Sequence, residues 1–148
     1  MQPVNKVQLI EIAIPGTGSA NTQTRVTFPD QPFLRTKYIN SLEIYTSNEI
    51  TTSPLGNAIL SSAQLKTGYL SLYGQDPESQ QSEGVWFQLV PLVDLHRIVN
   101  GTDPYVFHPY EIEPRQIQWE KSQFFFSAQL GNTAALSILL KVGYQNTF

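Results

Sequence analysis

Short stretches of this sequence alternate between apolar and polar residues with a period of two, and turn residues separate them. In the stretch SLEIY at residues 41–45, Leu42 and Ile44 alternate with residues suited to a solvated face. Successive side chains of a β-strand point to opposite faces, so this pattern is typical of strands with one buried face. Ten prolines and nine glycines are spread between the stretches as breaks. The pattern predicts an antiparallel all-β protein.

Eight stretches carry enough of this pattern to predict strands. Helical patterning is weak and is limited to Asn57–Lys66 and Val90–Val99, where it predicts a turn or two each. About eight strands in 148 residues fit a single-domain antiparallel β-sandwich over residues 1–148, most simply a jelly roll. The predicted strands lie near residues 4–14, 21–28, 38–46, 68–73, 85–90, 104–112, 115–120 together with 122–128, and 135–145.

Two stretches depart from simple alternation. In the first predicted strand the apolar residues change parity between Leu9 and Ile10, which predicts a β-bulge or a strand that crosses a sheet corner. The segment Gly74 to Gly84, GQDPESQQSEG, contains no large apolar residue. Because such a segment cannot offset its ordering entropy by burial, we expect an exposed acidic tip outside the core.

The charge pattern and the absence of cysteine exclude several classes of protein. The nine Lys and Arg residues are scattered singly between Lys6 and Lys141, and the net charge is −3, so we expect no direct contact with nucleic acid. Without cysteine there is no thiol catalysis and no disulfide. Gln8 and Glu11 interrupt the apolar N-terminal stretch, and the longest apolar run, ALSILL, has six residues. We therefore expect a soluble protein with neither a leader peptide nor a membrane span.

One polar stretch, Val93 to Glu111, contains both histidines and is the best candidate for catalysis. His96 paired with Asp94 or Asp103 would have the composition of an oriented general base. No nucleophile is marked beside it, because no serine lies in a G-x-S-x-G turn. Asp94 and Arg97, three residues apart, can instead stabilise a short turn. We expect the stretch to be a structural loop and the protein not to be an enzyme.

The same stretch is also the best candidate for a metal site. The available ligands are His96, His108, Glu111 and Glu113. The two histidines are twelve residues apart, and neither H-x-H nor H-E-x-x-H occurs. We therefore expect neither a metal ion nor another cofactor.

Aromatic residues suggest two kinds of binding surface. Trp86 and Trp119, with the tyrosines, could form a platform that stacks on sugar rings, although both tryptophans share the pattern of core residues. In the run Phe124-Phe125-Phe126 alternation must send Phe125 away from its two neighbours. An outward phenylalanine and the apolar terminal residue Phe148 are both predicted to be covered at a subunit interface.

Three segments together resemble a known family. They are QPFLRTKYINSLEIYT, TSPLGNAILSSAQLKTGYLSLY and VPLVDLHRIVNGTDPYVFHPYEI, and they lie between Gln31 and Trp119. Their order is similar to that of small jelly-roll virion structural proteins of Bacteroidota phages, crAss-like phages included. The pieces that carry the resemblance are Leu34-Arg35, Ile44-Tyr45-Thr46, the turn Ser53-Pro54-Leu55-Gly56-Asn57, and the run Pro91-Leu92-x-x-Leu95-His96-Arg97-Ile98.

The resemblance implies a capsid, vertex or decoration subunit that works by symmetric packing. Its expected partners are copies of itself and other virion proteins, and its expected location is the virion, after synthesis in the host cytoplasm. The family offers no catalytic residue to carry over to this chain. A carbohydrate-binding module on the same fold remains the alternative, and the burial of Trp86 and Trp119 discriminates between the two.

Overall fold

A computed structural model describes residues 6–16, 24–47, 50–76, 78, 82–95, 110–127, 130 and 134–147. Most of this part of the chain is β-structure. Its strands are β1 (Lys6–Ile14), β2 (Thr24–Thr27), β3 (Tyr38–Tyr45), β4 (Ala58–Ile59), β5 (Gly68–Gln75), β6 (Ser82–Pro91), β7 (Tyr110–Arg115), β8 (Gln123–Phe126) and β9 (Leu136–Gln145). The helical elements are the 3-10 turns η1 (Leu34–Thr36), η2 (Leu92–Asp94) and η3 (Trp119–Lys121), and the short α-helix α1 (Ser62–Leu65).

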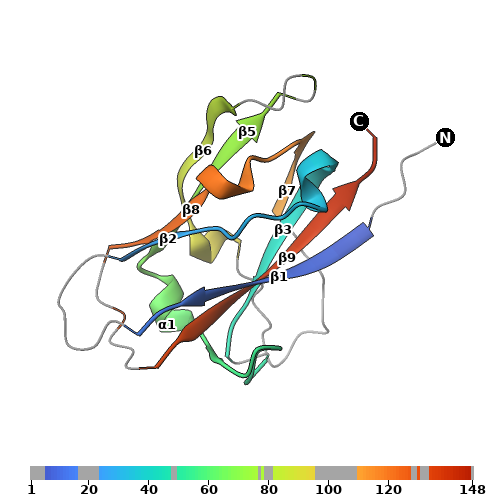
Figure 1. The fold of residues 1–148 in the computed structure, drawn as a ribbon. Coiled ribbons are helices and arrows are strands. Elements are labelled where there is room, and N and C mark those ends of the chain that lie inside the picture. Colours follow the sequence, from blue (N-terminus) through green and yellow to red (C-terminus); the bar gives the residue numbers. More distant parts are fainter. Residues whose placement is uncertain are drawn as a thin grey trace, which may run out of the picture.

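The strands form two sheets that pack face to face, as Figure 1 shows, so the prediction of an all-β antiparallel sandwich is confirmed. Sheet A has the order β1-β9-β3-β7, with β4 added to β9 in the parallel direction. Sheet B has the order β2-β8-β5-β6. Apolar side chains from the inner faces of both sheets form one core, in which Leu42 of β3, Leu140 of β9, Leu70 of β5 and Phe124 of β8 are fully buried.

The strand pairing is nested along the chain. Within the described residues the first strand, β1, pairs with the last, β9, and β2 pairs with β8. Further inward β3 pairs with β7, and β5 pairs with β6. The chain therefore folds back on itself as one long antiparallel hairpin, whose arms are divided between the two sheets.

Most predicted strands are found, but the one over residues 115–120 is wrong beyond Arg115, where β7 ends. Ile117 makes only an isolated bridge to Gly74, and residues 119–121 form the turn η3. The turn still buries Trp119, as the period-two pattern had placed it. An alternating strand and the observed 3-10 turn both bring Ile117 and Trp119 inward. The sequence pattern therefore predicts the burial of these side chains correctly but not the backbone conformation. Residues 104–109 of another predicted strand lie outside the described part.

Each of the two weakly helical stretches contains one short helical turn next to a strand. In the first, a single turn, α1, begins after Ser61, which forms a capping box with Gln64, and the unpredicted strand β4 precedes it. In the second, the turn η2 occupies residues 92–94, and residues 96–99 lie outside the described part.

The predicted bulge in the first strand is absent. β1 pairs with β9 without a break, from Lys6 opposite Tyr144 to Ile14 opposite Leu136. Ile10 and the even-numbered apolar residues that follow it face the core throughout, whereas Val7 and Leu9 are 56% and 41% exposed. The change in apolar parity therefore reflects two outward apolar side chains on a regular strand.

The acidic tip is shorter than predicted. Gly74 and Gln75 belong to β5 and pair with Gly84 and Ser82 of β6. Gln75 is buried because its amide finds polar partners, described below, and a polar side chain with such partners can be buried at little cost. Glu78 is exposed, as expected.

Strand β6 contains the one non-glycine residue with a positive φ in the described part of the chain. Leu89 has a φ of 52°, at the point where the register between β5 and β6 shifts, and its N–H donates to Ser71 Oγ at 3.2 Å. An L-residue in this left-handed region costs about 1–2 kcal/mol.

Replacing Leu89 with glycine should raise the free energy of unfolding by about 0.5–1 kcal/mol, because the relief of backbone strain exceeds the entropic cost of glycine. Urea denaturation measures this change. The control is Val90→Gly, one residue further along the strand at an ordinary φ, where the same substitution should destabilise the protein. Equal destabilisation by both variants would show that Leu89 is not strained.

Candidate interaction surface

The polar stretch with both histidines lies mostly outside the described residues. His96, Arg97, Asp103 and His108 are among those outside, as is the side chain of Glu111. Asp94 lies in η2 and Glu113 in β7, and both are exposed. Within the described ranges no three His, Cys, Asp or Glu side chains come close enough to hold a metal ion. The catalytic and metal hypotheses therefore gain no support from the described geometry.

The outer face of sheet B carries Phe125. Phe124 and Phe126 are fully buried in the core, and Phe125 points outward and is half-buried, as alternation predicts. Its cross-strand neighbours are Arg25 of β2 and Tyr69 of β5. The Arg25 guanidinium carbon lies 5.0 Å from the centre of the Phe125 ring, and the ring centres of Tyr69 and Phe125 are 6.5 Å apart.

These residues form a continuous row across the whole sheet. Pro91 of β6 lies opposite Tyr69, so the row runs Arg25-Phe125-Tyr69-Pro91 through all four strands of sheet B. We call it the aromatic row. The next outward positions, Thr27, Gln123 and Ser71, are small or neutral. The face thus has an apolar, ring-bearing stripe with a single cation at one end and an uncharged polar border.

The two tryptophans do not contribute to this row in the described structure. Trp119 is 1% exposed and stacks on Phe28, with ring centres 5.6 Å apart, so its predicted place in the core is confirmed. Trp86 lies in β6, and its side chain is outside the described part, as is Phe148. Trp119 is therefore excluded from any sugar-stacking platform.

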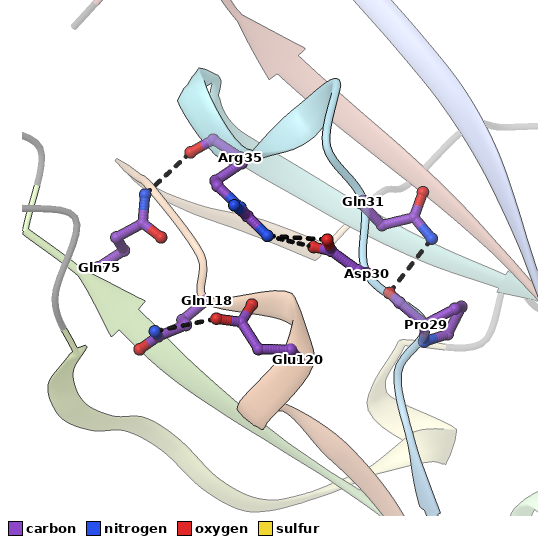
Figure 2. Close-up of polar contacts among 7 residues, drawn as sticks. All are labelled: Pro29, Asp30, Gln31, Arg35, Gln75, Gln118 and Glu120. Carbon is purple, nitrogen blue, oxygen red and sulfur yellow. Dashed lines mark hydrogen bonds and ion pairs between the residues drawn. The ribbon is translucent and has the colours of Figure 1, made fainter.

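A second polar group of residues joins η1 to the end of sheet B (Figure 2). Arg35 of η1 donates to both carboxylate oxygens of Asp30, at 2.7 and 2.8 Å. The hydrogen bond with Asp30, and then its charge, raise the pKa of Arg35. The Gln75 side chain of β5 donates to the backbone carbonyl of Arg35 at 3.1 Å. The Gln118 side chain donates to Glu120 at 3.0 Å.

Three glutamines hold this arrangement together from the inside. Gln75 also donates to Gln116 Oε1 at 3.3 Å, and Gln116 donates to the carbonyl of Thr36 at 3.3 Å. Gln75, Gln116 and Gln118 are all buried. Gln116 and Gln118 alternate in the sequence with Ile117 and Trp119, a pattern that by itself predicts solvated glutamines. No signal in the sequence identifies the partner of Gln116 in η1 or that of Gln118 in η3. The side chains of Gln75 and Gln116 bind the backbone carbonyls of Arg35 and Thr36, so these two glutamines fasten η1 to β5 of sheet B and to the residue that follows β7.

A carboxylate on the outer face of sheet A fastens the loop that follows β3. Glu11 of β1 accepts from the N–H of Leu55 at 3.0 Å and from Ser137 Oγ at 2.7 Å. Burial acts to raise the pKa of the Glu11 carboxyl, but hydrogen bonds from Ser53, Ser137 and the Leu55 backbone together hold that pKa below its ordinary value. The loop turn Ser53–Asn57 is thereby held against β1 and β9.

Replacing Glu11 with glutamine should lower the free energy of unfolding at pH 7 by about 1 kcal/mol, because hydrogen bonds to a charged acceptor are lost. Because the pKa of Glu11 is lowered in the folded state, its carboxylate stabilises the protein fully at pH values above the ordinary pKa of glutamate. This contribution is lost as the pH falls through the folded-state pKa. Denaturation at several pH values should therefore show the two proteins converging in acid. The exposed Glu113→Gln variant is the control, and a difference that persists in acid would contradict the assignment.

Comparisons of the chain with protein-family models, with curated proteins and with solved structures found no match. The longest helix in the described ranges, α1, has four residues, and none of the helices there could cross a bilayer.

Proposed function

We propose that this protein is a structural subunit of a bacteriophage virion, in a capsid, vertex or decoration role, and that its sandwich is a jelly roll. The nested pairing supports the second part. With the two-residue β4 set aside, the strands pair first with eighth, second with seventh, third with sixth and fourth with fifth. A four-pair hairpin wound into two sheets has this connectivity. Jelly rolls of this kind occur in viral capsid domains and in lectins.

The aromatic row is the observation that carries the first part of the proposal. Phe125 and Tyr69 present ring surface on the outer face of sheet B, and Pro91 extends it to the edge strand. Aromatic and arginine side chains are enriched at the centres of protein interfaces, and lysine, aspartate and glutamate are depleted there. The aromatic row contains aromatic and arginine side chains and contains no lysine, aspartate or glutamate. Its proposed partners are copies of the same chain and other virion proteins.

The test is a charge placed in the centre of the aromatic row. Phe125→Glu should leave the melting temperature of the isolated protein close to that of the wild type, because Arg25 lies opposite and can pair with the new carboxylate. Losing one buried phenylalanine from an interface costs about 1.5–3 kcal/mol, so incorporation into phage particles should fall roughly 10- to 150-fold. Particle composition by mass spectrometry measures this fall.

Ala63→Glu is the matched control, because Ala63 is exposed on α1 and the change in charge is the same. Incorporation of Phe125→Glu at the control level would rule out the aromatic row as an assembly surface. If no particle contains the wild-type protein, the virion role itself is wrong.

Carbohydrate binding is the second candidate, and the same rings favour it. Tyr69 and Phe125 are tilted by 32° and offer neighbouring faces, with Gln123 and Ser71 beside them as hydrogen-bonding groups. Sugar rings stack on such faces while polar neighbours bind their hydroxyls. On this reading the Tyr69→Ala variant loses binding on a glycan array, and the Ala63→Glu variant keeps it.

A further inference from the structure

Strand β1 is an edge strand that lacks the features that usually protect edges. It pairs on one side, with β9, and no described strand lies on its other side. Natural edge strands are commonly shortened, bulged, interrupted by proline or lined with charge. β1 has nine residues, no bulge and no proline, and its charged residues are Lys6 at its start and Glu11, whose carboxylate is bound to the Ser53–Asn57 turn.

The outward side of β1 carries two exposed apolar side chains, Val7 and Leu9. Their exposed fractions are 56% and 41%. Two of the six exposed large apolar side chains in the described ranges therefore lie on one open edge strand.

We infer that β1 pairs with β1 of a second copy, antiparallel about a two-fold axis that passes midway between the two Gln8 residues. This inference names one contact of the symmetric assembly proposed above, and it rests on that proposal. In this register Gln8 faces Gln8 of the other copy, and Val7 faces Leu9 on both sides of the axis. The four apolar side chains form one cluster on the outer surface, and sheet A continues from one copy into the next.

The residue pattern of β1 favours a second copy as the occupant. A two-fold axis perpendicular to a sheet pairs outward residues with outward residues, so residue numbers that face each other must have an even sum. The sum of 16 satisfies this rule, and along the overlap of the two β1 strands, residues 6–10 of each copy, the outward side chains that it brings together are the uncharged Val7 and Leu9. A net charge of −3 gives weak repulsion between copies.

The test uses the fact that the chain contains no cysteine. In the Gln8→Cys variant the new thiol faces the same thiol of the second copy. Facing Cα atoms of antiparallel strands are about 4.5–5.5 Å apart, a separation that a disulfide spans. Under mild oxidation the purified full chain should form a covalent dimer at least about tenfold faster than Ala63→Cys, because association raises the effective concentration of the facing thiols.

The register is tested by two further single-cysteine variants. Val7→Cys and Leu9→Cys should cross-link faster when mixed than either does alone, since residue 7 faces residue 9 and not itself. Adding Leu9→Glu to Gln8→Cys should abolish the rate advantage, and the new carboxylate lies opposite Lys141 on β9, so the subunit keeps its own sheet. Adding Val93→Glu, a substitution at an equally exposed apolar residue of η2, should leave the rate advantage unchanged.

Two outcomes separate this inference from the virion proposal. If Gln8→Cys links no faster than Ala63→Cys, β1 pairing is wrong, even where Phe125→Glu lowers incorporation into particles and the virion role stands. If Gln8→Cys links with the predicted register in a protein that joins no particle, the pairing is right and the virion role is wrong.

Discussion

Replacing Trp119 with alanine is expected to destabilise the protein by about 3–5 kcal/mol, the range typical of deleting a fully buried aromatic side chain. The indole is 1% exposed and stacks on Phe28, which in turn stacks on Phe124 with ring centres 4.6 Å apart. Its removal leaves a cavity between η3 and sheet B that the rigid rings cannot close. Urea denaturation followed by circular dichroism measures the loss.

Trp119→Phe is the matched variant. The Trp119 Nε1 atom is buried and has no hydrogen-bond partner among the described residues, so phenylalanine removes a polar group that contributes nothing to stability. The loss for Trp119→Phe should therefore be well under half that for Trp119→Ala. A phenylalanine variant as unstable as the alanine variant would show that the indole N–H has a partner in solution.

Gly68→Ala is expected to cost about 1–3 kcal/mol by overpacking, although it adds only a methyl group. Gly68 begins β5, where a Cβ would overlap Leu92 Cδ1 of η2 and lie 2.7 Å from Phe126 Cε1 of β8. All three residues are buried, so their side chains have no space to move into. Thermal unfolding measures the effect.

Gly56→Ala separates this effect from the general cost of replacing glycine. At Gly56 a Cβ would meet nothing within 4 Å, but the backbone has a φ of +87°. The cost there is conformational, and Gly56→Asn should recover part of it because asparagine tolerates the left-handed region. Gly68→Asn should recover nothing. Recovery at both positions would mean that Gly68 is not constrained by packing.

Sequence alternation predicts the sandwich because most strands have one buried face. In β9, for example, Ile138, Leu140 and Val142 face the core as their parity requires. The rule fails where burial depends on a specific partner. Gln116 and Gln118 have solvent parity but are buried, because both find hydrogen-bond partners. The partner of Gln116 is the carbonyl of Thr36 in η1, far away in the sequence, whereas Gln118 binds Glu120 of the adjoining turn η3.

The sequence likewise predicts one part of the candidate interaction surface and not the other. Three consecutive phenylalanines require an outward ring, so Phe125 can be identified from the sequence, although its role at an interface remains a prediction. Its neighbours Arg25 and Tyr69 follow from strand register, which alternation alone does not determine. Val7 and Leu9 lead to the wrong prediction of a β-bulge, because apolar residues on the outward face of a regular strand give the same sequence pattern as a shift in alternation.

The nested pairing has a consequence for how the protein is made. Strand β9 lies between β1 and β3 and forms the centre of sheet A, yet it is the last described strand to leave the ribosome. Until then β1 lacks its partner, with its apolar residues unpaired, while sheet B can already form from β2, β5, β6 and β8. Closure of long chain loops is slow, so maturation should depend on synthesis of the final strand, and the nascent chain is open to mispairing along β1 for most of its translation.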